Sequence, residues 1–207
     1  MNGRLISIEG GEGAGKSSVM AALCDALSAR GIEVVSTREP GGTDAGETIR
    51  ELLLDPAKVL CAETELLLMF ASRAQLVREV IRPSLARGAW VVSDRFTDAS
   101  FAYQGGGRGI DSGRIAELER WAAAIKPDLT FLLDVDVELG HGRIKPRGAM
   151  DRIEREHAEF FQRVRETYLA RALAEPNRFR VIDAGAAPNA VERAVLATLD
   201  AWLAKNP

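Results

Sequence analysis

Short apolar runs alternate along the chain with longer segments in which apolar residues recur at helical spacing. The apolar runs predict five β-strands, at residues 5–8, 32–36, 90–93, 129–133 and 179–182. Helical spacing predicts helices at residues 16–30, 111–124 and 189–203, a long helix ending near residue 173, and two segments between residues 43 and 88 that are interrupted near Pro56 and bent at Pro83. Because parallel neighbours need long crossovers that are usually helical, the alternation predicts an α/β fold, a parallel five-stranded sheet flanked by helices on both faces.

The ends of the predicted strands are the places to look for ligand contacts, because ligands bind beyond the carboxyl ends of such strands. Three of these strands are followed directly by an aspartate: Asp94, Asp134 and Asp183. An acid at this position can hold Mg²⁺ or its waters, and from spacing alone Asp94 and Asp134 compete for that role. Arg95 follows Asp94 and could bind a phosphate, with a purely structural Asp–Arg ion pair as the alternative.

A glycine-rich segment joins the first strand to the first helix. Residues 10–17 read Gly-Gly-Glu-Gly-Ala-Gly-Lys-Ser and match the phosphate-loop pattern G-x-x-x-x-G-K-[ST] in its required strand-to-helix context. In such a loop the backbone N–H groups surround the phosphates, the lysine reaches the outer phosphates, and the serine can ligate Mg²⁺. We therefore predict a nucleotide-phosphate site made by Gly10, Gly11, Glu12, Gly13, Ala14, Gly15, Lys16, Ser17 and Ser18.

The phosphate loop leaves the reaction open, because switches, motors, transporters and kinases all contain one. The base-reading motif N-K-x-D of guanine-nucleotide switches does not occur in the sequence. A small-molecule kinase needs an acceptor pocket near the loop and cations for the phosphoryl group in transfer. Candidates for both features are present.

One arginine lies on an otherwise apolar helix face. At about 100° per residue, Leu66, Phe70, Arg73 and Val77 fall on one narrow stripe. A buried arginine must be paired, so Arg73 either meets a carboxylate in the core or points into a ligand cavity. In the second case Phe70, one turn earlier, would give the cavity an aromatic wall suited to a nucleobase.

Residues 143–155 concentrate positive charge. Five cations, Arg143, Lys145, Arg147, Arg152 and Arg155, stand against two acids in this segment. Charge runs are usually solvated faces, but this one interrupts an α/β pattern where closing lids are often inserted. Because the phosphate loop contains no arginine, we predict a lid over about residues 140–155 whose arginines neutralise the transferred phosphoryl group.

Composition and charge narrow the remaining classes of protein. A length of 207 residues, against about 150 per domain, predicts a single domain over residues 1–207. The longest apolar run is six residues, at 66–71, whereas a membrane-spanning helix needs about 20, so no membrane partner is expected. The net charge of −3 argues against nucleic acid as the main ligand. No signal-peptide hydrophobic region is evident at the N-terminus, and we expect the protein in the cytoplasm.

The cysteines and histidines do not suggest a metal or disulfide site. Cys24 and Cys61 lack metal-ligand spacing and are too few for a disulfide scaffold, so both are expected to be reduced and structural. His141 and His157 are far apart, and we expect solvated positions for both.

Taken together, the motifs resemble those of the bacterial thymidylate kinases, from about residue 6 to residue 184. Besides the phosphate loop, the resemblance rests on residues 37–43 (Thr-Arg-Glu-Pro-Gly-Gly-Thr), 94–96 (Asp-Arg-Phe), 102–109 (Ala-Tyr-Gln-Gly-Gly-Gly-Arg-Gly) and 147–152 (Arg-Gly-Ala-Met-Asp-Arg). A phosphate loop without arginine beside a lid that has them is similar to the branch in which the lid supplies the catalytic cations. The resemblance implies a P-loop NTPase three-layer fold and transfer of the γ-phosphoryl group of Mg·ATP to dTMP, which gives dTDP on the route to dTTP.

The resemblance also implies a set of residues that bind dTMP. Phe70 would stack on thymine, although Met69 occupies the alternative position on the helix turn, and Arg73 would bond a thymine carbonyl. Ser100 and Gln104 match positions near the base and sugar, and Tyr103 would lie under the deoxyribose, where a 2′-hydroxyl would clash. The substrate phosphate would be held by Arg95 with Arg50 and Arg38, and Glu39 and Pro40 belong to the same substrate-binding motif. Glu12 would sit near the 3′-hydroxyl or a metal-bound water.

The catalytic group implied in the same way consists of cations. Lys16, Arg95, Arg143 and Arg147 would act on the transferred phosphoryl group, Lys145 would close over the ATP phosphates, and Ser17 and Asp94 would hold Mg²⁺. No general base is expected, because a phosphate oxygen of the acceptor is already anionic at pH 7. The family is typically a homodimer, and the apolar helices around residues 52–68 are the candidate interface.

Two alternatives stay open at the level of sequence. One is another mononucleotide or nucleoside kinase on the same fold, which would differ only in base and sugar contacts around Phe70, Arg73 and Tyr103. The other is a phosphate-loop switch or regulatory ATPase that signals to a partner.

Overall fold

A five-stranded parallel sheet organises the molecule, whose computed structural model describes residues 3–143 and 151–206. The strands are β1 (Leu5–Gly10), β2 (Val34–Arg38), β3 (Trp90–Asp94), β4 (Leu129–Asp134) and β5 (Phe179–Asp183), in the spatial order β2-β3-β1-β4-β5. The predicted fold class and all five strands are confirmed. Four strands run one or two residues further at the carboxyl end than predicted, and β2 is shifted by two residues.

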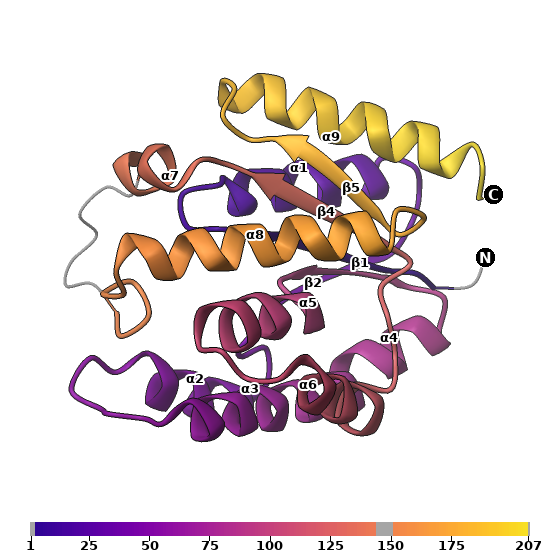
Figure 1. The fold of residues 1–207 in the computed structure, drawn as a ribbon. Coiled ribbons are helices and arrows are strands. Elements are labelled where there is room, and N and C mark those ends of the chain that lie inside the picture. The colour runs from indigo at the N-terminus through magenta and orange to yellow at the C-terminus, as the bar shows by residue number, and fades with distance from the viewer. Residues whose placement is uncertain (1–2, 144–150, 207) are drawn as a thin grey trace.

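Helices cover both faces of the sheet and give three layers (Figure 1). On one face lie α1 (Lys16–Ser28) and α9 (Pro188–Leu203), which pack against each other. The other face is covered by α8 (Ala158–Ala174), α5 (Thr97–Ser100) and the π-helical segments η1 (Val77–Ile81) and η2 (Phe101–Gly107). The remaining helices are α2 (Asp44–Leu54), α3 (Ala62–Leu76), α4 (Arg82–Ala86), α6 (Ser112–Leu118), η3 (Glu119–Ala123) and α7 (Val137–Arg143).

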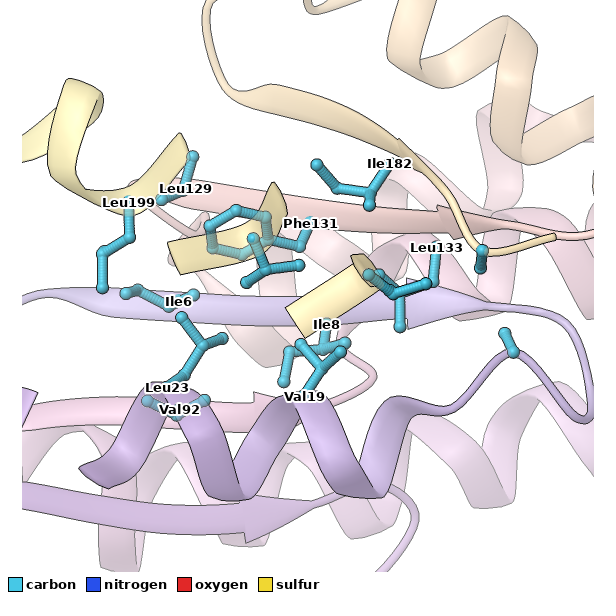
Figure 2. Packing of buried hydrophobic residues seen from close by; sticks show 14 of the residues in the cluster. Ile6, Ile8, Val19, Leu23, Val92, Leu129, Phe131, Leu133, Ile182 and Leu199 are labelled. Carbon is cyan, nitrogen blue, oxygen red and sulfur yellow. The ribbon is translucent and has the colours of Figure 1, made fainter. Parts of the chain in front are cut away.

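The alternation of side chains along the strands builds two cores. Ile6 and Ile8 of β1 point toward the face covered by α1, where they pack with Phe131 and Leu133 of β4 and with Val19 (Figure 2). Leu5 of β1 and Leu132 of β4, which alternate with them, enter two cores on the opposite face. A central strand buried on both faces is typical of parallel sheets, and it holds the end of β1, from which the phosphate loop departs, in a fixed place.

Two helical stretches were not predicted, α5 with the η2 segment that continues it, and α7, and glycine explains part of the first. The glycine-rich residues 105–109 were not predicted as helical, yet η2 continues through Gly107. A Cβ on Gly106 would lie 2.0 Å from the Thr167 hydroxyl oxygen, and one on Gly107 would lie 2.4 Å from the Phe160 ring. These glycines therefore allow η2 to lie directly against α8. The second unpredicted segment is α7, which leads from β4 into the predicted lid.

The cysteine and histidine expectations hold only in part. Cys24 is half-buried, but Cys61 is exposed at the start of α3 and is no part of the core. His157 is exposed as expected, whereas His141 is half-buried with its ring edge-on to Phe161 at 4.7 Å.

Within the described ranges, no helix is both long enough and apolar enough to cross a membrane.

Candidate active site

A cavity of about 1130 Å³ opens at the carboxyl ends of the strands. The predicted site residues that line it are Glu12, Gly13, Ala14, Gly15, Lys16, Ser17, Ser18, Arg38, Glu39, Pro40, Arg50, Arg73, Asp94, Arg95, Ser100, Tyr103, Gln104 and Arg143. Gly10 and Gly11 border a much smaller neighbouring cavity behind the loop. The structure thus brings together, around one space, residues that lie up to 131 positions apart in the chain.

Lys16 is held by the loop that precedes it. Its ammonium donates to the carbonyl oxygens of Gly11 at 3.0 Å and Gly10 at 3.3 Å, and the side chain is almost fully buried. Burial and the nearby Arg95 guanidinium lower the pKa of Lys16, while Glu12 opposes the shift. The lysine is therefore positioned at the base of the cavity before any ligand contact.

The phosphate loop is packed directly against the helix that starts the predicted lid. Gly13 of the loop has a φ of +70°, and a Cβ there would lie 2.0 Å from the carbonyl oxygen of Gly140 in α7. Reciprocally, a Cβ on Gly140 would lie 2.4 Å from the carbonyl oxygen of Glu12. Only two glycines permit this approach, so the position of α7 is tied to that of the loop.

Arg95 follows β3 with a left-handed backbone, at a φ of +69°. Its guanidinium donates to the carbonyl of Gly10 at 2.9 Å and to Glu12 Oε1 at 2.7 Å, and it lies 4.8 Å from the centroid of the Tyr103 ring. Although burial disfavours its charge, the Tyr103 and Glu12 groups hold the pKa of Arg95 well above its ordinary value. Left-handed backbone at a bulky residue is uncommon and concentrates at functional positions.

A buried chain of hydrogen bonds supports Arg95 from below. Tyr168 accepts from Arg95 Nη1 at 3.3 Å and donates to Glu9 Oε2 at 2.7 Å, and the other Glu9 oxygen accepts from the backbone N–H of Phe96 at 2.7 Å. Burial, with a contribution from Asp98, raises the pKa of Glu9 to about 8. Glu9 and Tyr168 were not predicted as part of the site.

Glu12 is the counter-charge of the cavity. Besides the contact with Arg95, its Oε1 accepts from the Tyr103 hydroxyl at 3.0 Å. Burial would raise the pKa of Glu12, but Arg95 and Lys16 outweigh it and lower that pKa, so the group is a carboxylate at neutral pH.

Arg73 combines both of its alternatives. It pairs with Glu39, with Nη2 at 2.7 Å and Nε at 2.8 Å from Oε2, and it donates to Ser100 Oγ at 3.0 Å. Arg73 and Glu39 both line the cavity, and among the described residues Glu39 Oε1, a buried oxygen, has no hydrogen-bond partner. The ion pair is therefore structural and also borders the space for a ligand.

Phe70 is not among the residues that face the cavity. It is buried in a cluster with Leu66, its ring lies 4.5 Å from the Arg73 guanidinium, and Met69 is the neighbour that lines the cavity. In this structure Phe70 supports Arg73 from behind, so Met69 is the better placed of the two against a base.

Two further arginines border the entrance between β2 and α2. Arg50 donates to the carbonyl of Pro40 at 2.9 Å, and its pKa is lowered by burial and by the nearby Arg38. Arg38 is exposed and pairs with Glu47 at 2.9 Å. Two arginines held near each other form a site that favours an anion.

Gln104 is buried beside a carboxylate that the sequence analysis missed. Its amide nitrogen lies 2.8 Å from Glu65 Oε1, and Glu65 is 1% exposed. Glu65 directly precedes the apolar run 66–71 of α3 but follows two polar residues, Glu63 and Thr64, so the helical spacing that singled out Arg73 does not mark it.

The three strand-end aspartates differ in how many of their carboxylate oxygens already accept hydrogen bonds. Both oxygens of Asp134 accept from Arg165, Oδ1 at 2.7 Å and Oδ2 at 3.1 Å, and Asp183 accepts from the backbone N–H of Gly185. Asp94 lines the cavity with a buried oxygen, Oδ1, that has no hydrogen-bond partner among the described residues. No group of three or more His, Cys, Asp or Glu side chains that could hold a metal occurs in the described part of the chain.

The predicted lid is only partly within the described residues. Lys145 and Arg147 lie outside them. Arg143 borders the cavity, and its guanidinium donates to three carbonyls after β5, those of Ala184, Gly185 and Ala186, at 2.5, 2.8 and 3.3 Å. Arg152, on the far side of the segment, bonds the Leu53 carbonyl and meets Glu65.

Comparisons with known proteins agree on one family. Residues 8–195 match the family model described as thymidylate kinase. A thymidylate kinase of Chromohalobacter salexigens is 60% identical over 206 residues, which are 98% of this chain and 97% of the relative. One of Methylobacillus flagellatus is 55% identical over 197 residues, 95% of this chain and 96% of the relative. A crystal structure of thymidylate kinase from Ehrlichia chaffeensis has a TM-score of 0.80 at 35% identity and covers 97% of this chain and 99% of its own.

Proposed function

Since the chain belongs to the thymidylate kinase family, and so phosphorylates dTMP to dTDP with ATP on the route to dTTP, we propose that it does so by alignment and charge neutralisation in the cavity described above. The observation that carries the proposal is the convergence of Lys16 and Arg95 on one carbonyl oxygen, that of Gly10. Lys16 is the first residue of α1, and Arg95 directly follows β3. The donor and acceptor phosphates would therefore meet between these two elements.

The acceptor dTMP would occupy the part of the cavity bounded by β3 and η2. Its phosphate would bind the guanidinium of Arg95, with Arg50 and Arg38 as further partners. The Glu39–Pro40 segment would line this part of the cavity. Its base would lie against Met69, near Arg73, Ser100 and Gln104, with Phe70 packed behind Arg73. Tyr103, held by its bond to Glu12, would lie under the sugar and would exclude a 2′-hydroxyl group.

The donor ATP would place its phosphates in the loop from Gly10 to Ser18, with Lys16 on the outer phosphates. Arg143, Lys145 and Arg147 would approach them from the lid. Ser17 and Asp94 fit a Mg²⁺ ion, because both line the cavity and a buried oxygen of Asp94 has no hydrogen-bond partner within residues 3–143 and 151–206. When bound, Mg²⁺ supplies charge neutralisation and orientation of the phosphates.

Proton transfer is not a demanding step in this reaction. The attacking oxygen belongs to a phosphate that is largely dianionic at neutral pH, so no strong base is needed. Glu12, kept ionised by Arg95 and Lys16, would instead hold Arg95 in place and meet the 3′-hydroxyl group or a metal-bound water.

We also propose a homodimer formed by the helices around residues 52–68, and a location in the cytoplasm, where both nucleotides are available. Leu52 and Leu67 are apolar side chains exposed in that region, which supports an interface there. Sedimentation of the wild type and of Leu67→Glu tests the dimer. The wild type should sediment as a dimer and the variant as a monomer, and a monomeric wild type would contradict the proposal.

The experiment that tests the acceptor site is ADP release from Mg·ATP with dTMP, dUMP, UMP, dCMP and AMP supplied in turn. Strong turnover with dTMP is expected, with little for UMP because of the position of Tyr103, and little for dCMP because Arg73 favours a ring carbonyl over an amino group. The Tyr103→Ala variant should gain on UMP relative to dTMP. A ratio that stays at the wild-type value would refute the role of Tyr103.

A further inference from the structure

The amide of Gln104 can present either of two opposite faces to a ligand. Rotation of the amide by 180° exchanges a carbonyl acceptor for an N–H donor at the same point in space. Gln104 is 1% exposed and lines the cavity, so the orientation of this one group decides whether the pocket accepts or donates a hydrogen bond there.

Glu65 settles that orientation. Its Oε1 accepts a hydrogen bond from the amide nitrogen of Gln104 at 2.8 Å, and an ionised carboxylate can accept hydrogen bonds but not donate them. Burial would raise the pKa of Glu65, but the bonds from Gln104 and from Arg108 outweigh it and lower that pKa. With the nitrogen turned to Glu65, the carbonyl branch of the amide is directed away from it.

The carboxylate itself has little freedom to move. Arg108 Nη2 donates to its Oε2 at 3.1 Å, and Arg152 Nη2 lies 2.7 Å from the same oxygen as a close charge contact. Arg152 is fixed in turn by its bond to the Leu53 carbonyl at 2.8 Å, and Arg108 by Glu156. Because Arg108 Nε also donates to both carboxylate oxygens at 3.3 Å, the two arginines hold Glu65 in place independently of Gln104.

We propose that Glu65 is a specificity-determining residue that acts through Gln104, by fixing the carbonyl oxygen of that amide toward the base of the acceptor nucleotide. The inference rests on the acceptor site proposed above. A carbonyl at this point suits a ring N–H donor, which thymine and uracil carry at N3. Cytosine carries an unprotonated ring nitrogen there, and two acceptors would then face each other in a buried site. The mismatch costs about tenfold or more in affinity.

Arg73 alone does not supply this discrimination. It is a donor-only group held by Glu39 and Ser100, so it favours a ring carbonyl over an amino group at one edge of the base. The Glu65–Gln104 pair adds an acceptor beside this donor, and the two together match the donor–acceptor pattern of thymine.

The test measures kcat/KM for dTMP, dUMP and dCMP in wild type, Glu65→Gln, Gln104→Leu and the double variant. An amide at position 65 can either donate or accept, so the amide of Gln104 would be free to rotate by 180°. We expect the dTMP-to-dCMP ratio to fall about tenfold in each single variant and no further in the double variant. The dTMP-to-dUMP ratio should stay at the wild-type value in Glu65→Gln, because both bases carry the same N–H group and a merely loosened pocket would change it.

Glu156→Gln is the matched control. It removes the other carboxylate from Arg108 but does not touch Gln104, so all three ratios should stay within about twofold of wild type. Folding is checked by thermal unfolding of each variant. Should Glu65→Gln fail to fold, the pair Glu65→Gln/Arg108→Gln, which also removes a cation, is compared with Arg108→Gln alone.

The two possible failures are distinct. A dTMP-to-dCMP ratio unchanged in Gln104→Leu would mean that the base does not lie at Gln104, and the proposed acceptor site would be wrong. A ratio that falls in Gln104→Leu but stays at the wild-type value in folded Glu65→Gln would overturn the role of Glu65 alone.

Discussion

The contact between the phosphate loop and α7 gives a sharp test, because a single added methyl group must separate them. In Gly140→Ala the new Cβ would lie 2.4 Å from the Glu12 carbonyl oxygen and 3.3 Å from Val135 Cγ1. The Glu12 oxygen belongs to the backbone of the loop and cannot rotate away as a side chain would. It must retreat by at least about 0.6 Å to reach 3.0 Å, below which real Cβ contacts essentially do not occur.

The size of the effect follows from what the loop does. Phosphoryl transfer depends on alignment, and a misplacement of 1 Å costs roughly 10²-fold in rate. We therefore expect kcat to fall about tenfold or more and KM for ATP to rise. Stability should fall by no more than about 2 kcal/mol, because the strain of about 1–3 kcal/mol is partly offset by the better helix propensity of alanine, about 1 kcal/mol.

The assay is steady-state ADP release with dTMP, together with thermal unfolding. Gly142→Ala is the control, since Gly142 lies on the same helix and a Cβ there would meet no atom of the described residues within 4 Å. It should keep kcat and gain up to about 1 kcal/mol of stability. If Gly140→Ala retained the wild-type kcat, the reasoning that couples α7 to the loop would be refuted.

Three further predictions follow from the charges of the site. Arg95→Ala should lower kcat/KM for dTMP by at least about 10²-fold, because two charge-assisted hydrogen bonds to the dTMP phosphate, of about 1.5–3 kcal/mol each, are lost. An unchanged kcat/KM would contradict the assignment of Arg95 to that phosphate. Lys16→Ala should reduce ADP release to background, whereas Cys24→Ala and Cys61→Ala should keep kcat, and loss of activity in either cysteine variant would show an unrecognised role. Burial raises the pKa of Glu9 to about 8 from 4.5, so the folded protein binds this proton more tightly, and stability falls as pH rises from about 4.5 to about 8. Glu9→Gln is neutral at every pH, so urea unfolding should show its stability rising relative to wild type by about 2 kcal/mol between pH 6 and pH 8, and a pH-independent difference would contradict the shift.

The sheet and the phosphate loop were predictable because their signals are local. Apolar runs of four to six residues and one eight-residue motif place the strands and the loop without knowledge of any distant contact. The helical η2 was not predicted, because Gly106 and Gly107 are required by a distant partner, helix α8. In isolation they look like a flexible loop, and only the approach of Phe160 and Thr167 explains them.

Within the site, the sequence identified a charged residue on an apolar helix face but did not identify the residue that pairs with it. Arg73 stood out by helical spacing, but nothing in the sequence pointed to Glu39 as its counter-charge. The bond between Glu9 and Tyr168 spans 159 positions and unites a strand with a helix that forms much later in the chain. Such pairings are set by the packing of the three layers, so they become visible only in the folded molecule.

The cations at the base of the cavity are already dehydrated by the fold itself. Lys16 rests on the carbonyls of Gly10 and Gly11, and Arg95 rests on Gly10 and Glu12. A phosphate that arrives exchanges these oxygens for its own, so the work of removing water from both charges falls on folding and not on ligand binding. Small free anions must displace the same oxygens without gaining any base or sugar contacts. Inorganic phosphate and sulfate should therefore be weak competitors of nucleotides at this site, however strongly positive it is.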